Sequence, residues 1–84
     1  MNRVERERIV AFLRERILQR TGLPEARLDN DTPLTDLGIK SVDVVLISGE
    51  IEDHFDLEVD PVMMFEYRTV DAVADRLLVL LERA

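Results

Sequence analysis

The chain has 84 residues, no cysteine, and 18 acidic side chains against 11 basic ones, for a formal net charge of −7. This length suits one domain, residues 1–84, and the lack of cysteine excludes disulfides and thiolate metal sites. No apolar run approaches the roughly 18 residues of a membrane span and no secretory signal is recognisable, so we expect a cytoplasmic protein that does not enter a membrane. Residues 1–20 carry +3 and residues 21–84 carry −10, which disfavours nucleic acid as a partner.

Apolar spacing predicts a first helix over about residues 4–20, followed by a long connection. Ile9, Leu13 and Ile17 recur at helical spacing, and the glycine and proline that follow residue 21 end the helix. The connection over residues 23–40 is longer than an ordinary loop, yet leucine or isoleucine recurs along it. We therefore expect this connection to pack across the other helices.

The second helix, over about residues 41–55, has two apolar stripes where a surface helix needs only one. The stripe that follows the i, i+3, i+4 rule should face the core, and it comprises Val44, Ile47, Ile51 and Phe55. The second stripe, a third of a turn or more away, comprises Val42, Val45, Leu46 and Gly49. Either this second stripe binds partner proteins, or the preceding connection folds over it and buries it.

Two further helices complete the predicted fold. A short one begins at Pro61 and ends near Phe65, and we expect its large side chains in the core, namely Met63, Met64 and Phe65. The last helix opens after Thr69, a good N-cap residue. Its predicted buried face comprises Val70, Val73, Ala74, Leu77, Leu78 and Leu81. The chain is therefore predicted to be an all-α four-helix bundle with a short third helix and a long loop between helices one and two.

Ser41 stands where the second helix begins, and two roles are open to it. The N-cap is the more common role for a serine at such a position, and attachment of a prosthetic group is the other. A catalytic serine needs a neighbouring base, but the single histidine, His54, lies 13 residues further along the same helix, roughly 20 Å away. The acidic segment Asp29–Asp31 lacks the glycine and the glutamate that complete a calcium loop. We therefore expect neither catalysis nor a metal site.

Three segments resemble acyl carrier proteins of the phosphopantetheine-binding family, and the resemblance covers nearly the whole chain. Leu37–Val42, LGIKSV, is similar to the family signature Leu-Gly-x-Asp-Ser-Leu. Ile51–Phe55, IEDHF, resembles the acidic end of the family's second helix. Phe65–Val70, FEYRTV, resembles the Phe-x-x-Pro-Thr-Val that leads into the last helix of polyketide and peptide synthetase carriers. The resemblance implies a 4′-phosphopantetheine arm on Ser41, which would hold acyl groups as thioesters for separate enzymes.

Two residues depart from the family pattern. Lys40 precedes the serine where the family usually has Asp, and Arg68 replaces the proline before the last helix. The charge reversal at Lys40 concerns the choice of the enzyme that loads the protein. Because no linker is recognisable at either end, we expect a free-standing, monomeric carrier. The segment before the last helix favours polyketide or related specialised metabolism over housekeeping fatty-acid synthesis.

The resemblance and the second stripe together predict the partners. These are a phosphopantetheinyl transferase, an acyl- or aminoacyl-loading enzyme, and a ketosynthase or other acyl-processing enzyme. Eight acidic residues and no lysine or arginine lie between Ser41 and Glu66, so basic surfaces of partners should be attracted. The predicted docking residues are Val42, Val45, Leu46, Gly49, Glu52 and Asp53. Two alternatives remain open: a peptidyl or aminoacyl carrier of a nonribosomal peptide synthetase, and an unmodified acidic helical adaptor in which Ser41 is only an N-cap.

Overall fold

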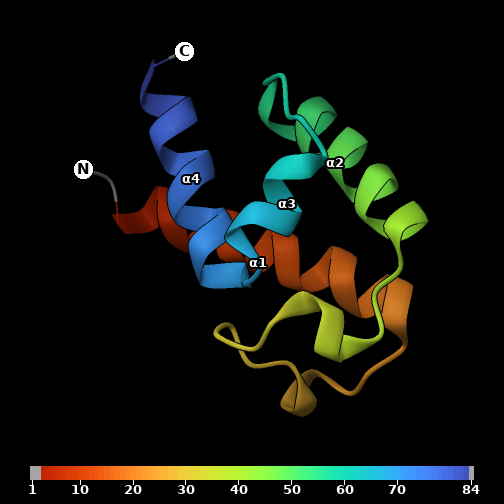
Figure 1. Ribbon diagram of the computed structural model, residues 1–84. Coiled ribbons are helices and arrows are strands. Elements are labelled where there is room, and N and C mark those ends of the chain that lie inside the picture. Colours follow the sequence, from red (N-terminus) through yellow and green to blue (C-terminus); the bar gives the residue numbers. More distant parts are fainter. Residues whose placement is uncertain (1–2, 84) are drawn as a thin grey trace.

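The computed structural model describes residues 3–83, and this part of the chain is all-helical, as predicted (Figure 1). Its four α-helices are α1 (Arg3–Thr21), α2 (Ser41–Phe55), α3 (Val62–Tyr67) and α4 (Val70–Arg83). The long connection between α1 and α2 contains two 3-10 turns, η1 (Glu25–Arg27) and η2 (Leu34–Leu37). In Figure 1, α3 lies between α2 and α4. None of the helices within residues 3–83 combines the length and the apolar character needed to cross a membrane.

The core lies between the helices and largely matches the predicted positions. The fully buried side chains of α1 and α2 include Ile9, Leu13, Ile17, Val44, Ile47 and Ile51. Those of α3 and α4 include Met64, Val70, Val73, Ala74 and Leu77. Phe12 is also buried, which the helical spacing did not single out, because its ring packs edge-on against Phe55 and stacks on His54. The expectation that Phe65 completes the core is wrong, since 44% of this residue is exposed.

The long connection packs against the α3–α4 junction, as its leucines predicted. Leu28 and Leu34 are buried. The backbone N–H of Leu34 donates to the carbonyl of Arg68 over 2.8 Å, and the N–H of Asp71 donates to the carbonyl of Asn30 over 3.0 Å. Each of these bonds joins chain segments at least 30 residues apart, so the connection is held on a defined side of the bundle.

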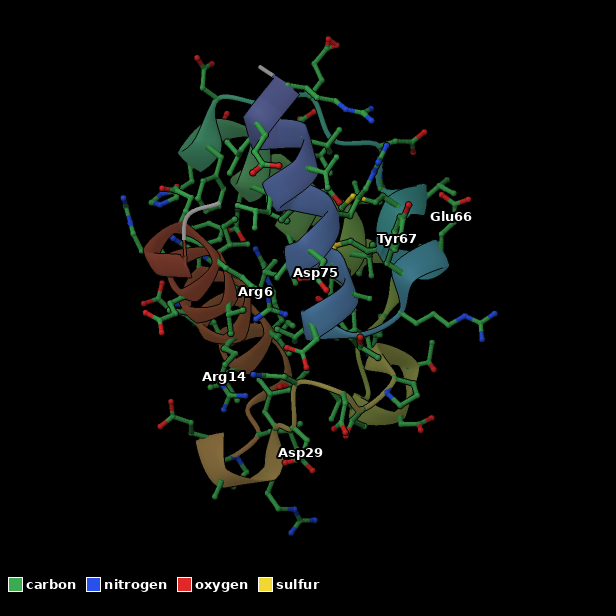
Figure 2. All side chains as sticks on the ribbon, turned by 90° about the vertical axis from the view of Figure 1, so that its left-hand side faces the viewer. Arg6, Arg14, Asp29, Glu66, Tyr67 and Asp75 are labelled. Carbon is green, nitrogen blue, oxygen red and sulfur yellow. The ribbon has the colours of Figure 1, made fainter. Side chains whose placement is uncertain are left out.

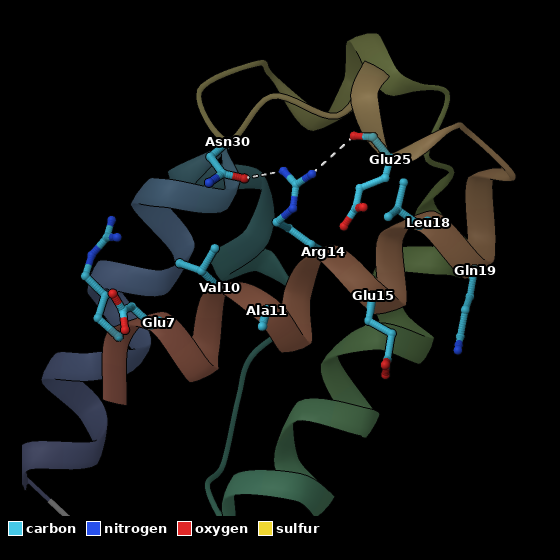
Figure 3. Close-up of a pocket in the computed structure, with 10 residues that line it drawn as sticks. Glu7, Val10, Ala11, Arg14, Glu15, Leu18, Gln19, Glu25 and Asn30 are labelled. Carbon is cyan, nitrogen blue, oxygen red and sulfur yellow. Dashed lines mark hydrogen bonds between the residues drawn. The ribbon is translucent and has the colours of Figure 1, made fainter. Parts of the chain in front are cut away.

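Arginine side chains of α1 fasten the other elements to that helix. Arg14 donates to the carbonyls of Leu28 and Glu25 and to Oδ1 of Asn30, which holds the connection against α1 (Figure 3). Arg6 faces Asp75 of α4, with 2.8 Å between Nε and Oδ1 (Figure 2). This hydrogen bond is the main cause that raises the pKa of Arg6 above its ordinary value, so the cation stays charged whenever the protein is folded.

The helix ends follow ordinary capping chemistry. The Thr69 hydroxyl accepts a hydrogen bond from the N–H of Ala72, as predicted for the start of α4. Pro61 stands at the N-cap of α3 instead of inside the helix, and α3 extends two residues beyond Phe65. Arg68 ends α3 in a left-handed conformation with φ of 66°, a region that non-glycine residues seldom adopt. Its N–H and its carbonyl are both hydrogen-bonded, to Met64 and Leu34, and these bonds hold that conformation.

Candidate attachment site and docking surface

Ser41 is the first residue of α2, and its side chain is exposed. Gly38, with φ of 82°, lets the chain turn out of η2, and Lys40 follows in an extended conformation as the N-cap of α2. The interpretation of Ser41 as the N-cap is therefore wrong by one position. Within the described residues its hydroxyl forms no hydrogen bond. The hydroxyl is thus free to carry a substituent without loss of a structural contact.

The start of α2 is stabilised by a carboxylate from inside the helix. The backbone N–H of Lys40 donates to Oδ2 of Asp43 over 3.0 Å, which is half of a capping box. The other half is missing, because a lysine side chain has donors only and cannot accept a bond from the first N–H groups of the helix. Asp43 therefore has a structural role beside Ser41 that its spacing three residues after the N-cap could have revealed.

No catalytic base or metal ligand set accompanies Ser41. His54 lies at the far end of α2, where its ring stacks on Phe12 with centroids 4.3 Å apart. Arg16 of α1 lies over the other ring of this contact, 4.9 Å from the Phe12 centroid, so the cluster joins α1 to α2. The part of the chain that the structure describes contains no group of three or more histidine, aspartate or glutamate side chains placed to hold a metal ion.

A groove of about 460 Å³ opens next to Ser41, between η2, the start of α2 and α3. Ile39 and Val44, two residues before and three residues after Ser41, form part of its wall. The rest of the wall comprises Pro33, Leu34, Thr35, Asp36, Met64, Phe65 and Arg68. An exposed hydroxyl beside a mainly apolar groove fits a long arm that is anchored by a phosphate and carries an acyl group. Sequence reasoning missed this groove because its walls come from three segments that meet only in the folded chain.

The second stripe of α2 is exposed to solvent. The exposed fractions of Val42, Val45 and Leu46 are 60%, 54% and 44%. The alternative that the long connection buries this stripe is therefore wrong, because the connection is bound to the α3–α4 junction. Gly49 is half-buried, and a Cβ atom placed on it would meet no heavy atom within 4 Å. Packing inside the chain consequently gives no reason for a glycine at this position.

The two predicted acidic docking residues differ in their surroundings. Asp53 is exposed and free to meet a partner. Glu52 is half-buried, and its Oε2 accepts a 2.8 Å hydrogen bond from the backbone N–H of Val59. Glu52 therefore holds the segment after α2 in place in addition to any contact with a partner.

Helix α3 adds apolar residues that sequence reasoning did not assign to the surface. Val62, Phe65 and Tyr67 are 54%, 44% and 38% exposed. Together with Val42, Val45 and Leu46 they are the exposed large hydrophobic residues of the described chain, so these residues come from α2 and α3 alone. Single exposed apolar residues are common, but their restriction to the two helices that border the groove is typical of an interaction surface.

A second hollow, of about 810 Å³, lies on the outer side of α1 (Figure 3). Its lining residues include Val10, Ala11 and Leu18, and Arg14 crosses it. The guanidinium of Arg14 is already bound to the long connection, and Ser41 does not line this hollow. Its greater volume therefore does not make it the site of the chemistry.

Comparison with known proteins agrees with this geometry. Residues 11–77 match the family described as "Phosphopantetheine attachment site". The polyketide synthase PksM of Bacillus subtilis (strain 168) is 27% identical over 73 residues. A chain of the phenolphthiocerol/phthiocerol polyketide synthase of Mycobacterium tuberculosis (strain ATCC 25618 / H37Rv) is 32% identical over 63 residues. These matches cover 87% and 75% of this chain but only 2% and 3% of the much longer synthases.

Two solved structures share the fold. A free-standing peptidyl carrier protein from an uncharacterized secondary metabolic pathway of Acinetobacter baumannii superposes with a TM-score of 0.84 at 25% identity, over 89% of this chain and 94% of that one. The HMG-ACPI domain from the CurA module of Lyngbya majuscula superposes with a TM-score of 0.83 at 19% identity, over 99% of this chain and 85% of that one, and shows the fold alone. Because the family match spans most of the chain, the protein belongs to the phosphopantetheine attachment-site family of non-catalytic carrier proteins, which hold covalently bound 4′-phosphopantetheine in polyketide and peptide synthesis.

Proposed function

We propose that Ser41 is the residue that accepts 4′-phosphopantetheine from coenzyme A, and that the protein carries acyl groups in polyketide or related specialised metabolism. One observation carries the proposal: the hydroxyl of Ser41 is exposed and unbonded at the first residue of α2, inside the segment that matches the family. The chain has one other serine, Ser48, which is only 2% exposed and donates to the carbonyl of Val44 over 2.8 Å. A transferase could reach Ser41 but could not reach Ser48 without unfolding α2.

The bound arm supplies the thiol on which an acyl group is held as a thioester. The residues of this chain do the remaining work. Ser41 anchors the arm, the rigid start of α2 fixes the direction in which the arm leaves, and the neighbouring groove offers apolar walls to a short acyl chain. Bond making and breaking is left to partner enzymes, since no base lies near Ser41 in the described structure.

The exposed apolar residues of α2 and α3 are proposed as the surface that partners recognise. The partners are the phosphopantetheinyl transferase, the acyl-loading enzyme, and a ketosynthase or other acyl-processing enzyme. Their contacts would be Val42, Val45, Leu46, Gly49 and Asp53 on α2, with Val62 and Phe65 on α3. The acidic charge around these residues favours partners with a basic rim, because complementary charge speeds encounter and suppresses wrong pairings.

A carrier of amino acids is the second candidate, and one observation favours it. The solved structure with a TM-score of 0.84 is described as a peptidyl carrier protein. The curated relatives, described as polyketide synthases, favour the acyl carrier. Loading assays separate the two: an adenylating enzyme that transfers an amino acid to the thiol supports the peptidyl carrier, and transfer by an acyltransferase supports the acyl carrier.

Attachment at Ser41 is tested by incubation of the purified protein with coenzyme A and a broad-specificity phosphopantetheinyl transferase, followed by intact-protein mass spectrometry. The wild type should gain one phosphopantetheine, and Ser41→Ala should gain none. Ser48→Ala is the matched control and should still be loaded. Ser41→Ala should keep the melting temperature of the unloaded wild type, because the hydroxyl makes no structural bond. A mass gain that persists in Ser41→Ala would refute the assignment.

A further inference from the structure

Lys40 is the only lysine of the chain, and it stands directly before Ser41. Between Arg27 and Arg68 it is also the only side chain with a full positive charge, among eleven aspartates and glutamates. A lone cation in so acidic a segment has many carboxylates within sequence reach. Nevertheless, its side chain is exposed and pairs with no carboxylate of the described chain. Neutralising a neighbouring acid therefore does not account for its position.

The backbone holds Lys40 beside the attachment residue. Its N–H is bound to the carboxylate of Asp43, and its carbonyl accepts the first hydrogen bond of α2, from the N–H of Val44 over 3.1 Å. The Cα atoms of Lys40 and Ser41 are about 3.8 Å apart across a trans peptide. A group bonded to the Ser41 hydroxyl therefore starts within the range of the flexible lysine side chain.

The electrostatic surroundings favour an anion at this place. The N–H groups of Ser41, Val42 and Asp43 precede the first hydrogen bond within α2, so the positive end of the helix points toward the same side. An aspartate N-cap would occupy one of these N–H groups and bring a negative charge. Lys40 does neither, and it adds a positive charge of its own.

We propose that Lys40 is a positioning residue, whose ammonium group pairs with the negatively charged phosphodiester that loading creates on Ser41 and so fixes the first part of the arm. The inference rests on the proposed attachment at Ser41. A phosphodiester adds negative charge to a chain that already carries −7, and repulsion alone would make loading destabilising. Lys40 reverses the local sign of this interaction.

The test compares the change in melting temperature on loading in four proteins. These are the wild type, Lys40→Gln, Lys40→Arg and Arg27→Gln. Arg27 is an exposed arginine in η1, and its substitution removes the same charge away from Ser41. Each protein is first shown by mass spectrometry to be fully loaded, and the ³¹P resonance of the phosphodiester is recorded as a second measurement.

For an exposed ion pair in a chain of this size, we expect the response to loading to be about 1–6 °C more favourable in the wild type than in Lys40→Gln. Lys40→Arg should restore this difference, Arg27→Gln should retain the wild-type response, and 1 M salt should remove the difference, since the screening length is then about 3 Å. The ³¹P resonance should move in Lys40→Gln only.

Two outcomes would overturn the inference while the attachment at Ser41 stands. Lys40→Gln could respond to loading as the wild type does, or Arg27→Gln could lose as much of the response as Lys40→Gln, which would indicate a general charge effect. A failure of the proposed function looks different: the wild type gains no mass, or Ser41→Ala still gains it. In that case both proposals fall.

Discussion

Replacement of Gly49 by alanine tests whether α2 gives up stability for a binding surface. Gly49 lies in the middle of the 15-residue helix, its φ is not in the left-handed region, and an added Cβ would touch nothing within 4 Å. The full difference in helix propensity should therefore be gained, about 0.8–1.0 kcal/mol. For a domain of this size, that gain corresponds to a rise in melting temperature of roughly 3–8 °C.

Gly22 provides a matched control of opposite sign. It follows α1 with φ of 72°, its N–H donates to the carbonyl of Leu18, and a Cβ would again meet nothing within 4 Å. Gly22→Ala adds the same methyl group in equally open space, but a left-handed backbone costs an L-residue about 1 kcal/mol or more. The two substitutions should therefore move the melting temperature in opposite directions.

The assay joins thermal denaturation to kinetics. The loaded variants are presented to a partner acyltransferase, and kcat/KM for transfer to the carrier is measured. If a partner approaches the backbone at Gly49, Gly49→Ala should be more stable and yet transfer more slowly, whereas Gly22→Ala should be less stable and transfer normally. A Gly49→Ala protein that melts at a lower temperature would refute the structural reasoning. A more stable variant with unchanged kcat/KM would remove Gly49 from the docking surface.

Three further predictions concern the surface of the protein. Leu46→Glu should keep the melting temperature within a few degrees of the wild type, because the side chain is already exposed, but should slow acyl transfer; a large loss of stability would place Leu46 in the core. Lys40→Asp should raise the melting temperature of the unloaded protein by supplying a capping carboxylate, about 0.5–2 kcal/mol, and should change the rate of modification; equal rates with every transferase tried would show that Lys40 does not select the loading enzyme. Added salt or millimolar divalent cations should raise the melting temperature of the wild type by screening the acidic surface, and a flat or falling curve in a salt titration would contradict this.

The helices and most of the core could be predicted from the sequence because they depend on local spacing. Apolar residues repeated every three or four positions identified α1, α2 and α4, and Thr69 marked the start of the last helix. The same spacing also explains a residue that was missed. Ser48 lies four residues after Val44 on the buried face, and its hydroxyl is satisfied by the Val44 carbonyl, so a polar side chain occupies a core position.

The sequence by itself determined which side chains share a face of α2, and it placed a serine at the start of that helix. It could not determine which face is covered, because two apolar stripes on one helix satisfy the same periodicity. Only the tertiary structure decided this, through long-range hydrogen bonds such as that from Leu34 to Arg68, which hold the long connection on the α3–α4 junction. The same contacts bring η2, α2 and α3 together around the groove and leave Phe65 at its edge. Spacing along a chain reports local geometry, whereas burial depends on which distant segments arrive.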